Sequence, residues 1–97
     1  RVTEAVAAVQ QEIEGLAIEW IELDATSPAA GATIGDGMYR TKTGSSIVAV
    51  IRDGQSIPAP GPDFGLAAHD VVVAVGTTEG LATMRELIRR GSASTGG

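Results

Sequence analysis

The residue types that could perform hydrolytic chemistry are few in this chain. Ser45 or Ser46 could act as a nucleophile, with His69 as a base and Asp70 to orient it. Neither serine stands in a Gly-x-Ser-x-Gly nucleophile elbow, and adjacent residues of a strand point in opposite directions, so His69 and Asp70 could not cooperate there. We therefore predict no catalytic residues, and the chain is not expected to be an enzyme.

The sequence also lacks a phosphate-binding loop motif and a set of metal-ligating residues. Residues 31–37, GATIGDG, lack the G-x-G-x-x-G spacing of a dinucleotide fingerprint and follow a turn rather than a strand. A single histidine and no cysteine leave no convergent set of metal ligands. We expect no cofactor and no metal, and interpret the scattered carboxylates as turn and helix-cap residues, namely Asp36, Asp53, Asp63 and Asp70.

Two side chains could instead bind an anionic ligand. Arg52 precedes Asp53-Gly54, where it is either a solvated side chain at a hairpin mouth or an anion contact, since a guanidinium matches phosphate geometry. His69 stands where a loop enters the last strand. It is either an exposed or half-buried turn residue or a hydrogen-bonding and stacking group for a ligand. The residues alone leave both alternatives open.

Composition narrows the class of protein. The 97 residues fit one small domain, and a domain of this size buries only about 60–65% of its unfolded surface, which favours a partner chain. A net charge of −5 argues against binding to nucleic-acid polymers or anionic lipid. No apolar run approaches the roughly 20 residues that a membrane span needs, so no direct membrane insertion is expected. The absence of cysteine is compatible with a reducing cytoplasm.

The two ends of the chain are expected to lie outside the main domain. In residues 2–14 the apolar side chains recur at helical spacing and form one stripe, comprising Val2, Val6, Val9 and Ile13. Gly15 is a natural helix end. We therefore predict a linker helix over residues 1–15, a main domain over residues 16–90 and a disordered tail over residues 91–97.

The main domain shows strand patterns followed by a helix pattern. Residues 16–23 and 45–54 are expected strands, and Asp-Gly at the end of the second predicts a hairpin with the return segment 55–60. Residues 70–76, DVVVAVG, predict a central buried strand. Residues 77–90 predict a closing helix whose inner face is formed by Leu81, Met84, Leu87 and Ile88. We predict an α+β fold with a small mixed β-sheet, a C-terminal packing helix and the N-terminal linker helix.

Two details of this arrangement bear on a binding site. Residues 24–44 are rich in turn residues, with a short helix possible over residues 31–40. Strict alternation along the second strand would place Val48, Val50 and Arg52 on one face and Ile47, Ala49 and Ile51 on the other. The three prolines of IPAPGP, residues 57–62, confine the return segment to a sheet edge and restrict its conformations.

The order of these signals resembles the RCK-C (TrkA-C) domain, and more narrowly the regulatory subunit of bacterial cation:proton antiporters of the KhtT type. The resemblance lies within residues 17–88 and is carried by four phrases, G-SIVAVIRDG, IPAPGPD, HDVVVAVGT and LATMREL. It implies a two-fold homodimer that regulates a potassium:proton antiporter at the cytoplasmic face of the membrane. Several relatives bind cyclic di-AMP between two such domains, and an isologous interface suits a two-fold ligand.

The resemblance also implies a half-site for cyclic di-AMP. An apolar pair that opens the second strand would contact adenine, and an arginine with backbone groups of the proline loop would reach the phosphate. A histidine near the following strand contributes in some members. Carried over to this sequence, the candidate residues are Ile47, Val48, Arg52, Ile57, Pro58, Ala59 and His69.

Two positions depart from the family pattern. Ala59 stands where the family often has asparagine, so a side-chain hydrogen bond is missing, and His69 stands where the family commonly has glycine. The histidine either compensates for the missing amide or accompanies a different ligand or none. We therefore hold two hypotheses: a cyclic di-AMP-sensing regulatory domain, and a ligand-free module that dimerises and docks on the same transporter.

Overall fold

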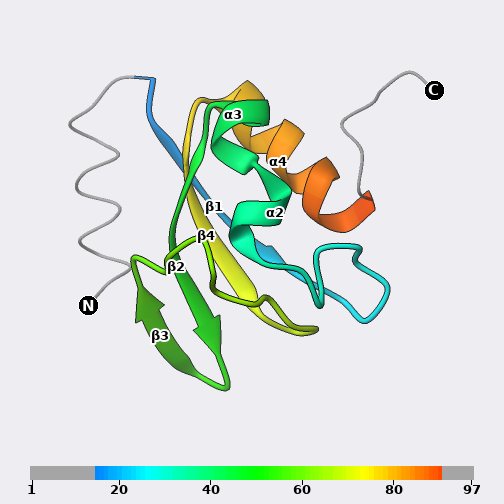
Figure 1. Cartoon of the computed structure of the whole chain (residues 1–97). Coiled ribbons are helices and arrows are strands. Elements are labelled where there is room, and N and C mark those ends of the chain that lie inside the picture. Colours follow the sequence, from blue (N-terminus) through cyan, green and yellow to red (C-terminus); the bar gives the residue numbers. More distant parts are fainter. Residues whose placement is uncertain (1–14, 91–97) are drawn as a thin grey trace.

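The computed structural model describes residues 15–90. Within this range a four-stranded sheet carries its helices on one face (Figure 1). The predicted linker helix over residues 1–15, apart from Gly15, and the predicted disordered tail over residues 91–97 lie outside the described residues.

The sheet has the strand order β1-β4-β2-β3. Its strands are β1 (Ala17–Glu22), β2 (Ser46–Arg52), β3 (Gln55–Pro58) and β4 (Val71–Gly76). The predicted strands and the central place of β4 are confirmed, but the prediction of a mixed sheet is wrong, because every pairing is antiparallel. β1 and β2 run in the same direction, yet β4 inserts between them, so no parallel pair forms.

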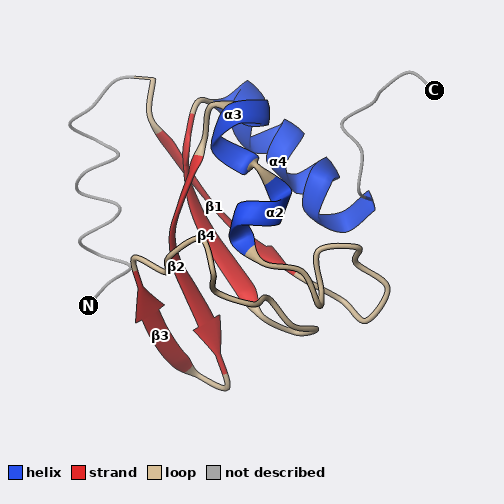
Figure 2. Cartoon of the chain, in the orientation of Figure 1, coloured by secondary structure: helices blue, strands red, loops and turns tan. Residues whose placement is uncertain are grey.

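Three helices cover one face of this sheet (Figure 2). They are α2 (Ile34–Gly37), α3 (Tyr39–Thr43) and α4 (Thr78–Arg90). The short helix expected over residues 31–40 is divided at Met38, whose left-handed φ of 51° ends α2 and begins α3. Thr33 and Asp36 form a capping box at the start of α2, which confirms Asp36 as a cap residue.

The core lies between α4 and the sheet. Leu81, Met84 and Ile88 follow helical spacing and are fully or almost fully buried, as predicted for the inner face of the closing helix, whereas Leu87 is partly buried against this core. They belong to one apolar cluster with residues of β1, β2 and β4, namely Ile21, Val50, Val72 and Ala74. Thr77 caps α4, since its Oγ1 accepts the Gly80 backbone N–H at 2.9 Å.

A β-bulge at Val48 overturns the alternation predicted for the second strand. Ile47 pairs with Ala74 and Val50 pairs with Val72, so the two β2 residues share a face although they are three positions apart. The pairing skips Val48, which is the extra residue of the bulge. Ile47 therefore lies with Val50 and Arg52 on the helix-covered face, and Val48 is 40% exposed.

None of the helices within residues 15–90 has the length and apolar character that crossing a bilayer requires.

Candidate ligand-binding pocket

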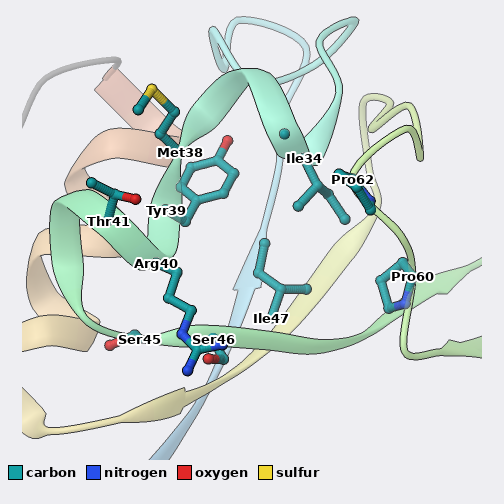
Figure 3. A pocket seen from close by; sticks show the side chains of 11 residues that line it. Ile34, Met38, Tyr39, Arg40, Thr41, Ser45, Ser46, Ile47, Pro60 and Pro62 are labelled. Atoms are coloured by element: carbon teal, nitrogen blue, oxygen red, sulfur yellow. The ribbon is translucent and has the colours of Figure 1, made fainter.

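A pocket of about 470 Å³ opens between the α2–α3 segment, the start of β2 and the proline loop (Figure 3). Ile34 of α2 and Ile47 of β2 point toward each other across it, and Pro60 and Pro62 form its far side. Arg40 of α3 reaches toward the start of β2 at the opposite end. The pocket therefore combines apolar walls with a single guanidinium, a combination that suits an anionic ligand with an apolar or aromatic part.

The proline loop is held in place by backbone hydrogen bonds to α2. Gly35 donates its N–H to the Pro62 carbonyl at 2.8 Å, and Ile34 donates to the Phe64 carbonyl at 3.0 Å. A Cβ at Gly35 would lie 3.0 Å from the Pro62 carbonyl oxygen, so glycine permits this close approach. The restricted proline backbone and these bonds together give the pocket a rigid wall.

Val48 and Ala59 do not line the pocket, but each is next in sequence to a residue that does, Ile47 or Pro60, and together they form its rim. The Ala59 backbone N–H donates to the Val48 carbonyl at 2.9 Å. The bulge residue Val48 thus provides the backbone carbonyl that Ala59, in the proline loop, contacts. Ala59 has a left-handed φ of 47°, a conformation in which asparagine is enriched and a residue with a plain Cβ is strained.

The Arg52 side chain forms hydrogen bonds within the fold. Its Nε and Nη2 donate to the two carboxylate oxygens of Asp70, at 2.9 and 2.7 Å, and Nη2 also donates to the Gly65 carbonyl at 2.8 Å. Its guanidinium lies 4.9 Å from the centroid of the Phe64 ring. Arg52 is thus one half of an ion pair that joins β2 to the loop before β4, a role that neither of the two alternatives left open by the sequence included.

Asp70 is a turn residue, as predicted, but it also has a second role in an ion pair. Asp70 accepts the Ala67 backbone N–H at 2.8 Å, as a turn residue would, but it is 1% exposed and paired with Arg52. The hydrogen bond from Arg52 lowers the pKa of the Asp70 carboxyl, and the Ala67 N–H adds to this effect, although burial opposes it. Asp70 is therefore a charged carboxylate held within the fold.

His69 lies away from the pocket. Its side chain is exposed, and its backbone N–H donates to the Leu23 carbonyl at 2.6 Å at the end of β1. Its φ of 74° is left-handed, which explains why glycine suits this position. Within one protomer His69 does not join the residues around Ile47.

The remaining predicted residues lie on the edge strand. Ile57 pairs with Val50 and Pro58 pairs with Ala49. Pro58 immediately precedes Ala59 and therefore stands near the rim, whereas Ile57 lines a separate hollow beside Arg52 at the hairpin. Six of the seven predicted residues thus fall into two groups, while His69 lies apart from both. One group comprises Ile47, Val48, Pro58 and Ala59, and the other comprises Arg52 and Ile57.

Sequence reasoning missed two contributors to this region, Ile34 and Arg40. They precede the predicted β2 strand in a segment interpreted mainly as turns. The sequence did contain a signal for the helix that carries Ile34, since Thr33 and Asp36 have the spacing of a capping box. No signal in the sequence showed that α3 would place Arg40 over the start of β2. In residues 15–90 no cluster of three metal-ligating side chains occurs.

The comparisons with known proteins agree on the type of domain. Residues 18–89 match the family model of the TrkA-C domain. A search of curated proteins found no match.

Three solved structures illustrate the similarity. An RCK-C domain dimer of S. agalactiae BusR in complex with c-di-AMP is 29% identical, with a TM-score of 0.68 over 74% of this chain and 95% of that one. The RCK C domain of the potassium transport protein KtrA, also in complex with c-di-AMP, is 26% identical, with a TM-score of 0.70 over 89% and 99% of the two chains. The GsuK channel is 32% identical, with a TM-score of 0.68 over 76% of this chain and 13% of its own.

Proposed function

Because the chain belongs to the TrkA-C domain family, we propose that it is a regulatory domain that binds cyclic di-AMP between two copies of itself. The solved RCK-C domains of BusR and KtrA contain this ligand at 29% and 26% identity to the chain. The observation that carries the proposal is the pocket bounded by Ile47 and the proline loop, because Ile47 is one of the apolar candidate residues and lines it.

The proposed mechanism is a shift between arrangements of two protomers. A two-fold ligand contacts the same half-site on each copy, so it stabilises the arrangement in which both pockets face it. The preference for this arrangement is the regulatory output. It reaches a potassium transport protein because the ligand site and the surface that contacts the transporter are energetically coupled. We propose a cation:proton antiporter as this partner and the cytoplasmic side of the membrane as the location. The domain itself performs no catalysis.

Calorimetric titration with cyclic di-AMP tests the proposal. We expect saturable heat with one ligand bound for each pair of protomers, and a light-scattering mass that corresponds to a dimer in the complex. Cyclic di-GMP serves as the matched control, because it keeps the ring of phosphates but changes the bases. Absence of heat at about 100 µM protein, a concentration that detects even weak binding, would contradict the proposal.

The second candidate function is a ligand-free module that dimerises and docks on the transporter. It is favoured by the outer face of the sheet, opposite the helices, where Trp20 is 41% exposed and pairs with Val73. A second copy of the chain would cover this face. A stable dimer by light scattering, with no change in melting temperature from any nucleotide, would support this function over the first. Trp20 is the only tryptophan, so its fluorescence reports on this face directly.

A further inference from the structure

We infer that Arg40 of α3 supplies the positive charge that recognises a phosphate of the nucleotide in this pocket, while Arg52 serves the fold. The inference rests on the proposed function and assigns its polar contact to a residue that the sequence did not indicate.

The first step is that Arg52 makes most of its polar contacts within the fold. Its Nε and Nη2 donate to Asp70 and to the Gly65 carbonyl, which leaves the two N–H groups of Nη1. Asp70 is 1% exposed, so turning Arg52 toward a phosphate would leave a buried carboxylate without its counter-charge. A ligand that turned Arg52 would have to supply more than that loss, so only Nη1 remains for a phosphate.

The second step is that Arg40 lines the pocket and can contact a ligand there. It is the basic residue among those lining the pocket, and its side chain extends across the start of β2 (Figure 3). Within residues 15–90 it takes part in no ion pair, whereas Arg52, Arg85, Arg89 and Arg90 each contact a carboxylate. A phosphate would therefore meet a guanidinium that need not leave a partner.

The third step concerns the order of groups along the pocket. The apolar side chains Ile34, Ile47 and Pro60 lie away from the Arg40 end, so a base can lie against them while the phosphate faces the guanidinium. Ala59 offers no side-chain donor at the opposite rim. The positive charge within one protomer is then supplied by Arg40, whose planar fork can bind two phosphate oxygens.

Titration of cyclic di-AMP into the wild-type chain and three variants tests this assignment. We expect Arg40→Ala to weaken binding about 5- to 30-fold at low salt, the size of one charge-assisted hydrogen bond at an exposed site. Arg40→Lys should fall between, because it keeps the charge and loses the fork. Lys42→Ala is the control: it removes the same charge from the same helix, is exposed, and lines a different hollow, so its affinity should stay within about twofold of wild type.

The salt dependence of binding provides a second readout. Loss of Arg40 should reduce the decrease in affinity between 50 and 500 mM salt (ionic strengths chosen to span roughly a threefold change in Debye length), whereas loss of Lys42 should not. Equal effects of Arg40→Ala and Lys42→Ala on affinity and salt dependence, in a wild type that binds, would overturn the inference alone. A wild type that does not bind would overturn the proposed function and the inference together. Melting temperatures of the variants should match, because both side chains are exposed.

Discussion

Arg52 at the end of β2 and Asp70 at the start of β4 form a two-point ion pair, with N–O distances of 2.9 and 2.7 Å. The pair spans 18 positions of sequence and encloses the hairpin and the whole proline loop. Asp70 also accepts the Ala67 N–H, and Arg52 also donates to the Gly65 carbonyl, so both side chains tie the end of that loop to the sheet. The loop that walls the pocket is therefore anchored at α2 and again at this pair.

Asp70→Asn should destabilise the fold in a pH-dependent way. The substitution keeps the shape but removes the charge, and we expect a loss of about 1–3 kcal/mol in unfolding free energy at neutral pH. Because the folded pKa of Asp70 is lowered, its contribution is complete above the unfolded value of 3.8 and is lost as the pH falls through the folded value. Urea melts from pH 7 to pH 2 measure this. A difference between wild type and variant that stays constant down to pH 2 would contradict the assigned ion pair.

Gly76→Ala should destabilise the domain by overpacking. A Cβ at Gly76 would overlap the Ser45 Oγ and lie 2.8 Å from the Ser45 Cβ, so the end of β4 and the start of β2 would have to separate. We expect a cost of about 1–3 kcal/mol by thermal or urea unfolding. Gly61→Ala is the matched control, since nothing lies within 4 Å of its Cβ position, and its stability should be unchanged or slightly raised.

His69→Gly should stabilise the domain. The φ of 74° at His69 costs an L-residue roughly 1–2 kcal/mol relative to glycine, and the greater freedom of glycine in the unfolded chain returns part of that gain. We expect a higher melting temperature for His69→Gly and a lower one for Ala67→Gly, which lies in the same loop without a positive φ. If His69→Gly were as destabilising as Ala67→Gly, the histidine side chain would be making a contact that outweighs its backbone strain.

Ala59→Asn should increase both stability and affinity for cyclic di-AMP. Asparagine tolerates the left-handed backbone at position 59 and adds a hydrogen-bonding amide at the rim, worth roughly 2- to 10-fold in affinity. Ala59→Gly separates the two effects, because it relieves the backbone without adding the amide. Calorimetry and melting curves of both variants are the measurement. Equal affinities for the two variants would show that the residue 59 side chain does not reach the ligand.

Much of this fold follows from local patterns. The β-branched run of β4 and the Asp53-Gly54 turn are short-range signals, because a buried central strand needs apolar side chains on both faces and a hairpin needs a residue pair that accepts positive φ. The apolar spacing along α4 likewise predicted Leu81, Met84 and Ile88 as core. The candidate residues Ile47 and Ala59 came from resemblance to the family, and the structure places them near one rim.

The rest depended on contacts between distant segments. The bulge at Val48 has no local signal in the sequence. It places Ile47 on the opposite face from the one predicted, because β2 pairs with β4 and also contacts the proline loop. In the sequence nothing pairs Arg52 with Asp70, which only the fold brings into contact with it. Arg40 likewise lies in a turn-rich segment, and only the packing of α3 against β2 places it at the pocket. Composition and periodicity therefore determined the elements and the core of this protein. Only the tertiary structure decided which arginine is bound within the fold and which is left to face the pocket, because electrostatic pairing depends on distance in space and not on position in the chain.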